Sequence, residues 1–284
     1  MTNDFDYRYD SCISRGICSM NPRTSSLQEV LVLYLKASAY YALKLYENDI
    51  VDERIKGMIL NTISILVSNP QFSETDFNVL THAYNTELPR LIKEYEEMCN
   101  KKGAEPEYLK TVIKYNKELD IIKAIQLGEK EFLKKVKELS QETQDLYKIL
   151  LVIAKSICIN VLDLETLDVD SKDGYLMILK ILNSLNIEET KEMGLKDLII
   201  EAVELDNQLM KLLRNSQEKR YGKQRVNDVS YTTTPAKAML VVGSNIRELE
   251  DVLEAVKDKN IDVYTHDEMM IAHTFPKFSE YKNL

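Results

Sequence analysis

Apolar residues recur at helical spacing along most of this chain, from residue 26 to about residue 214. Ser26 and Glu29 form a capping-box pattern, and we expect the first helix to begin there. Pro89 lies inside the third segment, where we expect a kink or a break. The predicted helices cover residues 26–48, 52–68, 73–99 (beginning at Ser73 or Thr75), 105–126, 129–139, 145–162, 174–185 and 195–214.

The pattern changes near residue 216. Residues 217–225 are rich in Lys and Arg, and this stretch is interpreted either as a solvated linker or as a docking segment for an acidic redox partner. A short apolar run follows at 239–243, then a predicted helix over 245–257 that Asn245 caps with Glu248, and a second short strand over 261–264. Strand, helix and strand of these lengths predict one βαβ unit with parallel strands.

Two parallel strands alone leave both faces and both edges of their sheet uncovered. We therefore expect the sheet to be completed, either by sequence that follows Leu284 or by another chain.

Two helical segments far apart in the chain resemble each other. Residues 31–39 align with residues 150–158, and each segment places a single lysine, Lys36 or Lys155, inside an apolar run. The repeat suggests two similar helical bundles in series. Convergence of two amphipathic helices is the alternative.

The composition excludes one fold class and makes some kinds of partner less favourable. The 284 residues include 8 glycines and 6 prolines, about half the usual supply of turn residues, which excludes an all-β sandwich. A net charge of −9 argues against a nucleic-acid partner. The polar, acidic start of the chain does not fit a signal peptide, and the most apolar stretch, 149–162, is interrupted by Lys155 and too short to span a bilayer. We therefore expect a cytoplasmic protein with no membrane partner.

Four cysteines offer limited metal chemistry. Cys12 and Cys18 lie in a glycine-bearing stretch before the first helix and suit iron–sulfur or zinc ligation, although a pair of free thiols fits equally well. Cys99, near a helix end, and Cys158, on an apolar helical face, are predicted to be packing residues.

Further candidate ligands follow the two predicted strands. His266 and Glu268 come after the second strand, and ligands bind at the carboxyl ends of strands in open α/β sheets. Residues 243–245 turn the first strand into a helix N-terminus that could bind an anion, but they contain one glycine where a dinucleotide fingerprint needs three. His273 is interpreted either as a ligand or, equally well, as a surface histidine, and His82 has no predicted partner.

The sequence resembles the hybrid cluster proteins, also called hydroxylamine reductases or prismane proteins, which are relatives of carbon monoxide dehydrogenase. The resemblance extends along nearly the whole chain. It is carried by Cys12 and Cys18 followed by Pro22, by residues 27–29 opening a helix with Lys36, by the repeat with Lys155, by residues 207–213 with 221–222, by 241–243 with 249–251, and by 262–269.

The resemblance implies a mainly α fold, with two three-helix bundles in series followed by the first βαβ unit of a Rossmann-like parallel sheet. The implied divisions are an N-terminal Cys loop at 1–25, helical bundles at 26–120 and 121–218, a linker at 219–236, and the incomplete α/β domain at 237–284. In the family, an N-terminal iron–sulfur cluster passes electrons to a hybrid iron–sulfur–oxygen cluster that reduces hydroxylamine or nitric oxide.

Three departures from the family pattern affect the expected chemistry. Cys12 and Cys18 are the last two of four family cysteines, and Ser244 stands where a histidine ligand of the hybrid cluster is normal. Glu268 matches the family's glutamate ligand. The remaining cluster cysteines of the family lie in sequence that follows Leu284, so the hybrid cluster is expected only if a C-terminal half is present.

The resemblance therefore predicts the N-terminal part of a hydroxylamine reductase-like iron–sulfur oxidoreductase. The alternative is a cluster-free relative that acts as a binding or scaffold protein, so whether this chain alone is an enzyme stays open. Expected partners are a C-terminal half or a second copy. Related carbon monoxide dehydrogenases bridge their subunits with a cluster, so we expect a homodimer that shares one iron–sulfur cluster through Cys12 and Cys18.

Overall fold

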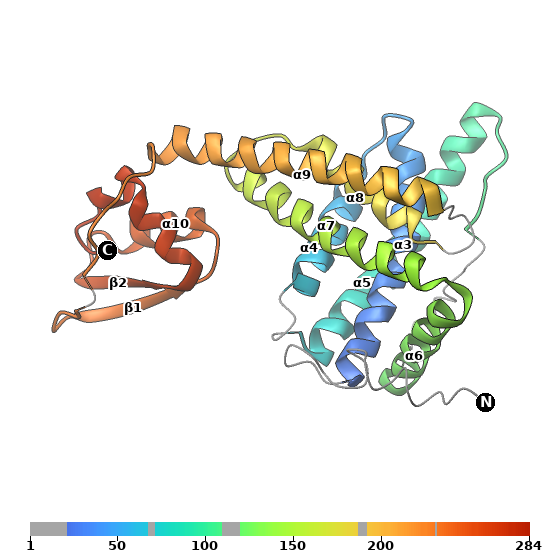
Figure 1. Cartoon of the computed structure of the whole chain (residues 1–284), viewed down its shortest axis with the longest axis horizontal. Coiled ribbons are helices and arrows are strands. Elements are labelled where there is room, and N and C mark those ends of the chain that lie inside the picture. The colour runs from blue at the N-terminus through green and yellow to red at the C-terminus, as the bar shows by residue number, and fades with distance from the viewer. Residues whose placement is uncertain (1–21, 68–71, 110–119, 187–191, 231) are drawn as a thin grey trace. The chain divides into compact units, whose positions relative to one another are not determined.

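The computed structural model describes residues 22–67, 72–109, 120–186, 192–230 and 232–284. These residues are mainly helical, with one small parallel sheet of two strands (Figure 1). The chain divides into two compact units. The first unit contains residues 1–159 and 172–206, and the second contains residues 160–171 and 207–284.

The first unit is built around its first described helix, α3 (Pro22–Tyr46). Helices α4 (Glu53–Val67), α5 (Glu74–Lys102), α6 (Ile121–Glu138) and α8 (Lys172–Ser184) all pack against it. Because α3 is covered on several sides, its buried residues are not confined to one stripe, as expected for a central helix. The fully buried ones include Leu27, Val30, Leu31, Tyr34 and Leu35.

The predicted start of the first helix at Ser26 is wrong. Helix α3 begins at Pro22, where a missing N–H costs nothing because the first turn has no intrahelical acceptor for it. Ser26 lies one turn further on, and its Oγ donates to the Pro22 carbonyl at 3.0 Å. Glu29 pairs with Lys135 of α6 instead of completing a cap.

The third predicted helix is not broken at Pro89. Helix α5 continues through Pro89, which is exposed, while its neighbours Leu88 and Leu91 are fully buried. Of the two predicted starts, Ser73 and Thr75, the structure has Ser73 as the N-cap of α5, in a capping box in which the Asp76 N–H donates to Ser73 Oγ at 3.3 Å. Of the helix predicted over 105–126, residues 105–109 are not helical, residues 110–119 lie outside the described residues, and residues 121–126 are helical.

Helix α6 runs without a break past Gly128, contrary to the predicted division between residues 126 and 129. A Cβ atom at Gly128 would lie 1.9 Å from the Ser26 carbonyl oxygen. Glycine is therefore required here because α3 and α6 approach each other too closely for any side chain.

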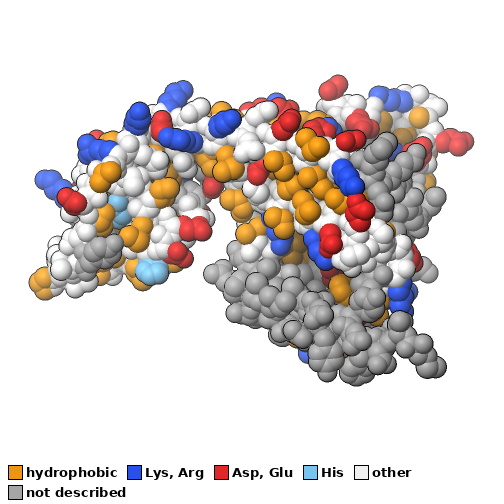
Figure 2. Space-filling view, viewed as in Figure 1, with side chains coloured by type: hydrophobic (Ala, Val, Ile, Leu, Met, Phe, Trp, Pro, Cys, Tyr) orange, Lys and Arg blue, Asp and Glu red, His pale blue; other side chains and the backbone are white. Residues whose placement is uncertain are grey.

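Helix α7 (Gln141–Thr166) and the first half of α9 (Glu192–Tyr221) lie side by side in the first unit. Lys196 pairs with Glu142 at 2.5 Å, and Ser156 donates to Asp206 at 2.8 Å. Exposed apolar side chains gather on this pair of helices (Figure 2). They include Ile149, Val152, Ile200 and Val203.

The second unit contains the predicted βαβ arrangement. Strands β1 (Lys237–Val242) and β2 (Ile261–His266) are parallel, and α10 (Ile246–Val256) connects them (Figure 1). Two 3-10 helices follow, η4 (Asp267–Thr274) and η5 (Pro276–Glu280). Their core contains Tyr221, Leu249, Leu253, Val263, Met269, Phe275 and Phe278.

Helix α9 continues to Tyr221, seven residues past the predicted end at Arg214. Tyr221 is 1% exposed and belongs to the core of the second unit, so burial of this ring holds the last turn in place.

Among the described helices, none has both the length and the hydrophobicity needed to cross a bilayer.

Candidate functional site

Two loops leave the parallel sheet at the same end, where the carboxyl ends of both strands lie. Val242 and His266 are the last paired residues of β1 and β2. Ser244 comes two residues after β1, and Glu268 two residues after β2. The structure therefore places these two predicted site residues at the carboxyl ends of adjacent parallel strands, and both are exposed.

The two loops pack against each other through Gly243 and Met269. A Cβ atom at Gly243 would lie 3.3 Å from Met269 Cε, while Met269 itself is 1% exposed and anchors η4. Asp267, between His266 and Glu268, has a φ of 59°, a left-handed conformation that aspartate tolerates better than most residues. This turn ends β2 and starts η4, and so fixes where Glu268 leaves the backbone.

The N-terminus of α10 follows Ser244 directly. Asn245 is its N-cap, as predicted, and its side-chain oxygen accepts a hydrogen bond from the Arg247 N–H at 2.9 Å. A small hollow beside this cap is lined by Ser244, Asn245, Asp163, Thr166 and Gln217. Its volume, about 10 Å³, is close to the minimum for one water molecule.

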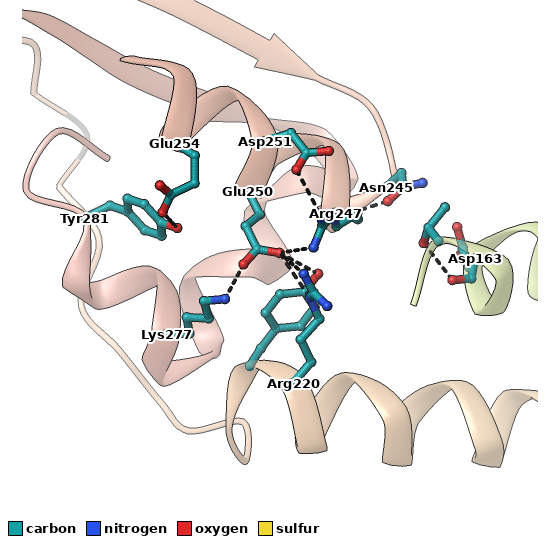
Figure 3. A network of polar contacts seen from close by, with 11 residues as sticks. Asp163, Arg220, Asn245, Arg247, Glu250, Asp251, Glu254, Lys277 and Tyr281 are labelled. Atoms are coloured by element: carbon teal, nitrogen blue, oxygen red, sulfur yellow. Dashed lines mark hydrogen bonds and ion pairs between the residues drawn. The ribbon is translucent and has the colours of Figure 1, made fainter. Parts of the chain in front are cut away.

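Asp163, from the last turns of α7, is the site residue that the sequence did not reveal. Figure 3 shows it opposite Asn245. Burial raises the pKa of Asp163 to about 6, and the negative charges of Glu248 and Glu268 contribute to the same rise. It is a helical residue some 80 positions before Ser244, and nothing in local spacing links the two. These carboxylates favour a cation or a proton near the cap over an anion.

The histidines near the sheet differ in their surroundings. His266 is exposed at the end of β2. His273 Nε2 lies 2.8 Å from Thr265 Oγ1, and burial lowers the pKa of His273. His82 lies on α5 in the first unit and is exposed.

The cysteines that the structure describes are packing residues, as predicted. Cys99 and Cys158 are buried free thiols, 5% and 0% exposed. Cys158 Sγ lies 3.3 Å from the Leu60 carbonyl oxygen, which accepts its hydrogen bond. Cys12 and Cys18 lie outside the described residues.

The residues that the structure describes do not fit a complete hybrid cluster. Within these ranges, no three His, Cys, Asp or Glu side chains are grouped so that they could hold a metal ion. Iron–sulfur clusters are held mainly by cysteine thiolates, and both described cysteines are buried in the first unit. Glu268 offers one carboxylate, and the Ser244 hydroxyl is a poor ligand unless it is deprotonated.

Comparison with known proteins gives the family. The sequence profile of the Prismane/CO dehydrogenase family matches residues 8–284. The chain is 26% identical to a hydroxylamine reductase of Petrotoga mobilis, over 98% of this chain and 51% of that protein. It is 25% identical to a hydroxylamine reductase of Methanococcus vannielii, over 96% of this chain and 49% of that protein.

A hydroxylamine reductase of Clostridium novyi is similar at 24% identity, over 95% of this chain and 48% of its own length. The chain thus spans about half the length of the curated relatives it matches, and the match covers nearly all of the chain. Since the family profile covers both structural units, including the loops of Ser244 and Glu268, this chain belongs to the Prismane/CO dehydrogenase family.

Proposed function

We propose that this chain is the N-terminal half of a hydroxylamine reductase-like iron–sulfur oxidoreductase. The resemblance puts hybrid-cluster ligands at two positions, Ser244 and Glu268. The main support for the proposal is that both follow adjacent parallel strands at their carboxyl ends. Reduction of hydroxylamine adds two electrons and two protons, breaks the N–O bond and gives ammonia and water. Because the described residues lack the remaining ligands, the proposed activity requires the half of the relatives that this chain does not match.

The open edge of β1 is the proposed contact for that second half. Among the described residues, β2 is the only strand that pairs with β1. Three apolar side chains of β1 are exposed, Met239 by 39%, Leu240 by 63% and Val242 by 60%. An apolar strand with an unpaired edge is a template for another strand. The outer edge of β2 is partly occupied, because the Val263 N–H donates to the Asn283 carbonyl at 2.6 Å.

Complementation tests this proposal directly. The chain is produced anaerobically, alone and together with the C-terminal half of the Petrotoga mobilis relative as a separate polypeptide. We expect iron, sulfide and hydroxylamine reduction with a reduced viologen dye only in the combined sample. Backbone amides of residues 239–242 should also gain protection from hydrogen exchange on complex formation. A stable complex that contains no iron and reduces no hydroxylamine would overturn the enzymatic proposal.

A cluster-free binding or scaffold protein is the second candidate. The observation that favours it is Ser244, which replaces the expected histidine ligand at an exposed position beside the sheet. Ser244→His in the combined sample separates the two functions, because a neutral imidazole is a good iron ligand. A rise in iron content or in hydroxylamine reduction supports a weakened cluster site, whereas no change in either supports the scaffold.

Cys12 and Cys18 are proposed to hold an iron–sulfur cluster at the interface of a homodimer. Two thiolates supply half of the four that a cubane cluster needs, and a two-fold axis supplies the other half. Anaerobic iron and sulfide analysis together with size determination of wild type and Cys12→Ser tests this. The wild type should be a dimer with one cluster per two chains, and the variant should lose iron. A cluster bound by a monomer, or an iron-free wild type, contradicts the proposal.

A further inference from the structure

A second candidate site lies in the first unit, away from the sheet. A cavity of about 100 Å³ opens between α3, α6 and α7. Its apolar wall consists of Val32, Phe132, Leu139, Leu151 and Leu185. Drug-sized ligands occupy pockets of roughly 300–1,000 Å³, so this cavity suits a molecule of only a few heavy atoms.

Lys36 of α3 lines this cavity and is 6% exposed. Its ammonium makes no hydrogen bond to any residue that the structure describes. Burial lowers the pKa of Lys36 to about 8, and Lys135 lowers it further, while Glu131 and Glu29 act in the opposite direction. The side chain is thus mostly charged at neutral pH, and burial of an ammonium without a hydrogen-bond acceptor costs free energy.

The other charged groups of the cavity already have partners. Lys135 pairs with Glu29, and Lys148 pairs with Asp145 at 2.9 Å. Of the three lysines that line the cavity, Lys36 is therefore the one without a carboxylate partner among the described residues. One unpaired positive charge next to an apolar wall matches a ligand with one negative charge and a short apolar body.

The equivalent lysine of the internal repeat shows that this arrangement is not a general property of these helices. Lys155 aligns with Lys36, but its Nζ donates to the Leu66 carbonyl oxygen at 2.9 Å. Lys155 therefore links α7 to the end of α4 by a hydrogen bond, which is a structural role. Lys36 makes no such bond to the described residues, and it lines a cavity.

We propose that this cavity binds a small aliphatic monocarboxylate, with its carboxylate accepting hydrogen bonds from Lys36 Nζ and its chain lying against Val32, Phe132 and Leu151. A phosphate fits less well, because it carries more charge than one lysine neutralises and because Glu29 lies at the same cavity. The site depends neither on iron nor on the sheet of the second unit.

Ligand-observed NMR titration with butyrate tests the site on the full chain. We expect saturable binding with a Kd on the order of 1 mM, as befits one charge-assisted hydrogen bond and a short apolar chain. Butyramide, which has the same shape without the charge, and inorganic phosphate should bind at least about tenfold more weakly. Equal affinity for butyrate and butyramide would show that Lys36 does not select the ligand.

Two variants and a matched control complete the test. Lys36→Met keeps the length of the side chain and should weaken butyrate binding at least about tenfold, whereas Lys155→Met should change it less than about twofold. Leu151→Trp fills the cavity and should also abolish binding, although Lys36 remains. Unchanged butyrate affinity in either Lys36→Met or Leu151→Trp overturns the proposal, as does the absence of saturable binding to the wild type.

Discussion

Arg220, in the last turn of α9, donates two hydrogen bonds to the buried carboxylate of Glu250 on α10, from Nε at 3.1 Å and from Nη2 at 3.0 Å (Figure 3). Arg247 also reaches Glu250, at 3.1 Å, and Lys277 of η5 contacts its other oxygen. The Glu250 side chain is 6% exposed, so a single buried carboxylate joins three elements of the second unit. The network explains why α9 extends into this unit.

Replacing Glu250 with Gln should destabilise the second unit by about 2–4 kcal/mol at pH 7, because three cations then face a neutral amide. The partners of Glu250 hold its pKa below the usual value, although burial opposes them. Its contribution is therefore present at neutral pH and is lost as the pH falls through the lowered pKa. Hydrogen exchange of α10 amides, measured from neutral to acid pH, follows this loss.

Glu254→Gln is the matched control on the same helix. Glu254 is exposed and contacts Lys257 at 2.7 Å and Tyr281 Oη at 2.6 Å. Exposed pairs contribute little, so the change should cost far less than Glu250→Gln. Equal effects of the two replacements would mean that the buried network adds nothing to stability.

Asp163→Asn should stabilise the second unit at alkaline pH. The pKa of Asp163 is raised to about 6 in the folded state, so the folded chain holds this proton more tightly than the unfolded chain. Wild-type stability therefore decreases as the pH rises from about 4 to about 6, and the variant should lack this decrease.

The expected gain for Asp163→Asn is about 1 kcal/mol above pH 7, reduced from the full linkage value because the carboxyl is partly solvated. Urea denaturation between pH 4 and 8 measures it, with Asp258→Asn, at an exposed aspartate of the same unit, as the control. Parallel pH profiles of wild type and Asp163→Asn would contradict the prediction.

Gly128→Ala should destabilise the first unit by more than about 3 kcal/mol, because the added methyl would overlap the Ser26 carbonyl and force α3 and α6 apart. Gly57→Ala makes the same chemical change in α4, where a Cβ atom would meet nothing within 4 Å. That variant should instead gain up to about 1 kcal/mol from helix propensity. Thermal unfolding of the two variants decides the matter, and a stable Gly128→Ala chain would refute the close helix contact.

Leu240→Thr should leave the second unit nearly as stable as before, within about 0.5 kcal/mol, because the Leu240 side chain is already 63% exposed. It should weaken association with the complementary half by about tenfold if β1 is the contact strand. Val226→Thr, at a 98% exposed residue outside the sheet, should change neither the stability of the second unit nor the association. Equal association of all three chains would show that the Leu240 side chain is not buried when the two halves associate.

The sequence alone determined the features that depend on neighbouring residues. Apolar spacing predicted most helices and the parallel βαβ unit, since helix and strand hydrogen bonds form locally or between short segments. The Asn245 cap was predicted from its residue type at the start of a helix. The burial of Cys158 followed from the same apolar spacing. Glu268 was a candidate because it follows a predicted parallel strand, whereas the family resemblance marked Ser244 as a ligand position.

Tertiary structure decided which side chains acquire distant partners. Glu29 and Ser26 fit a capping box by spacing, yet Glu29 pairs with Lys135 and Ser26 lies against Gly128, more than 100 residues away. Lys36 and Lys155 are equivalent in the repeat, but one faces a cavity and the other a carbonyl oxygen. Asp163 meets the strand ends only in the folded chain. Packing brings such residues together, and the local spacing of apolar residues does not indicate which distant residues will meet.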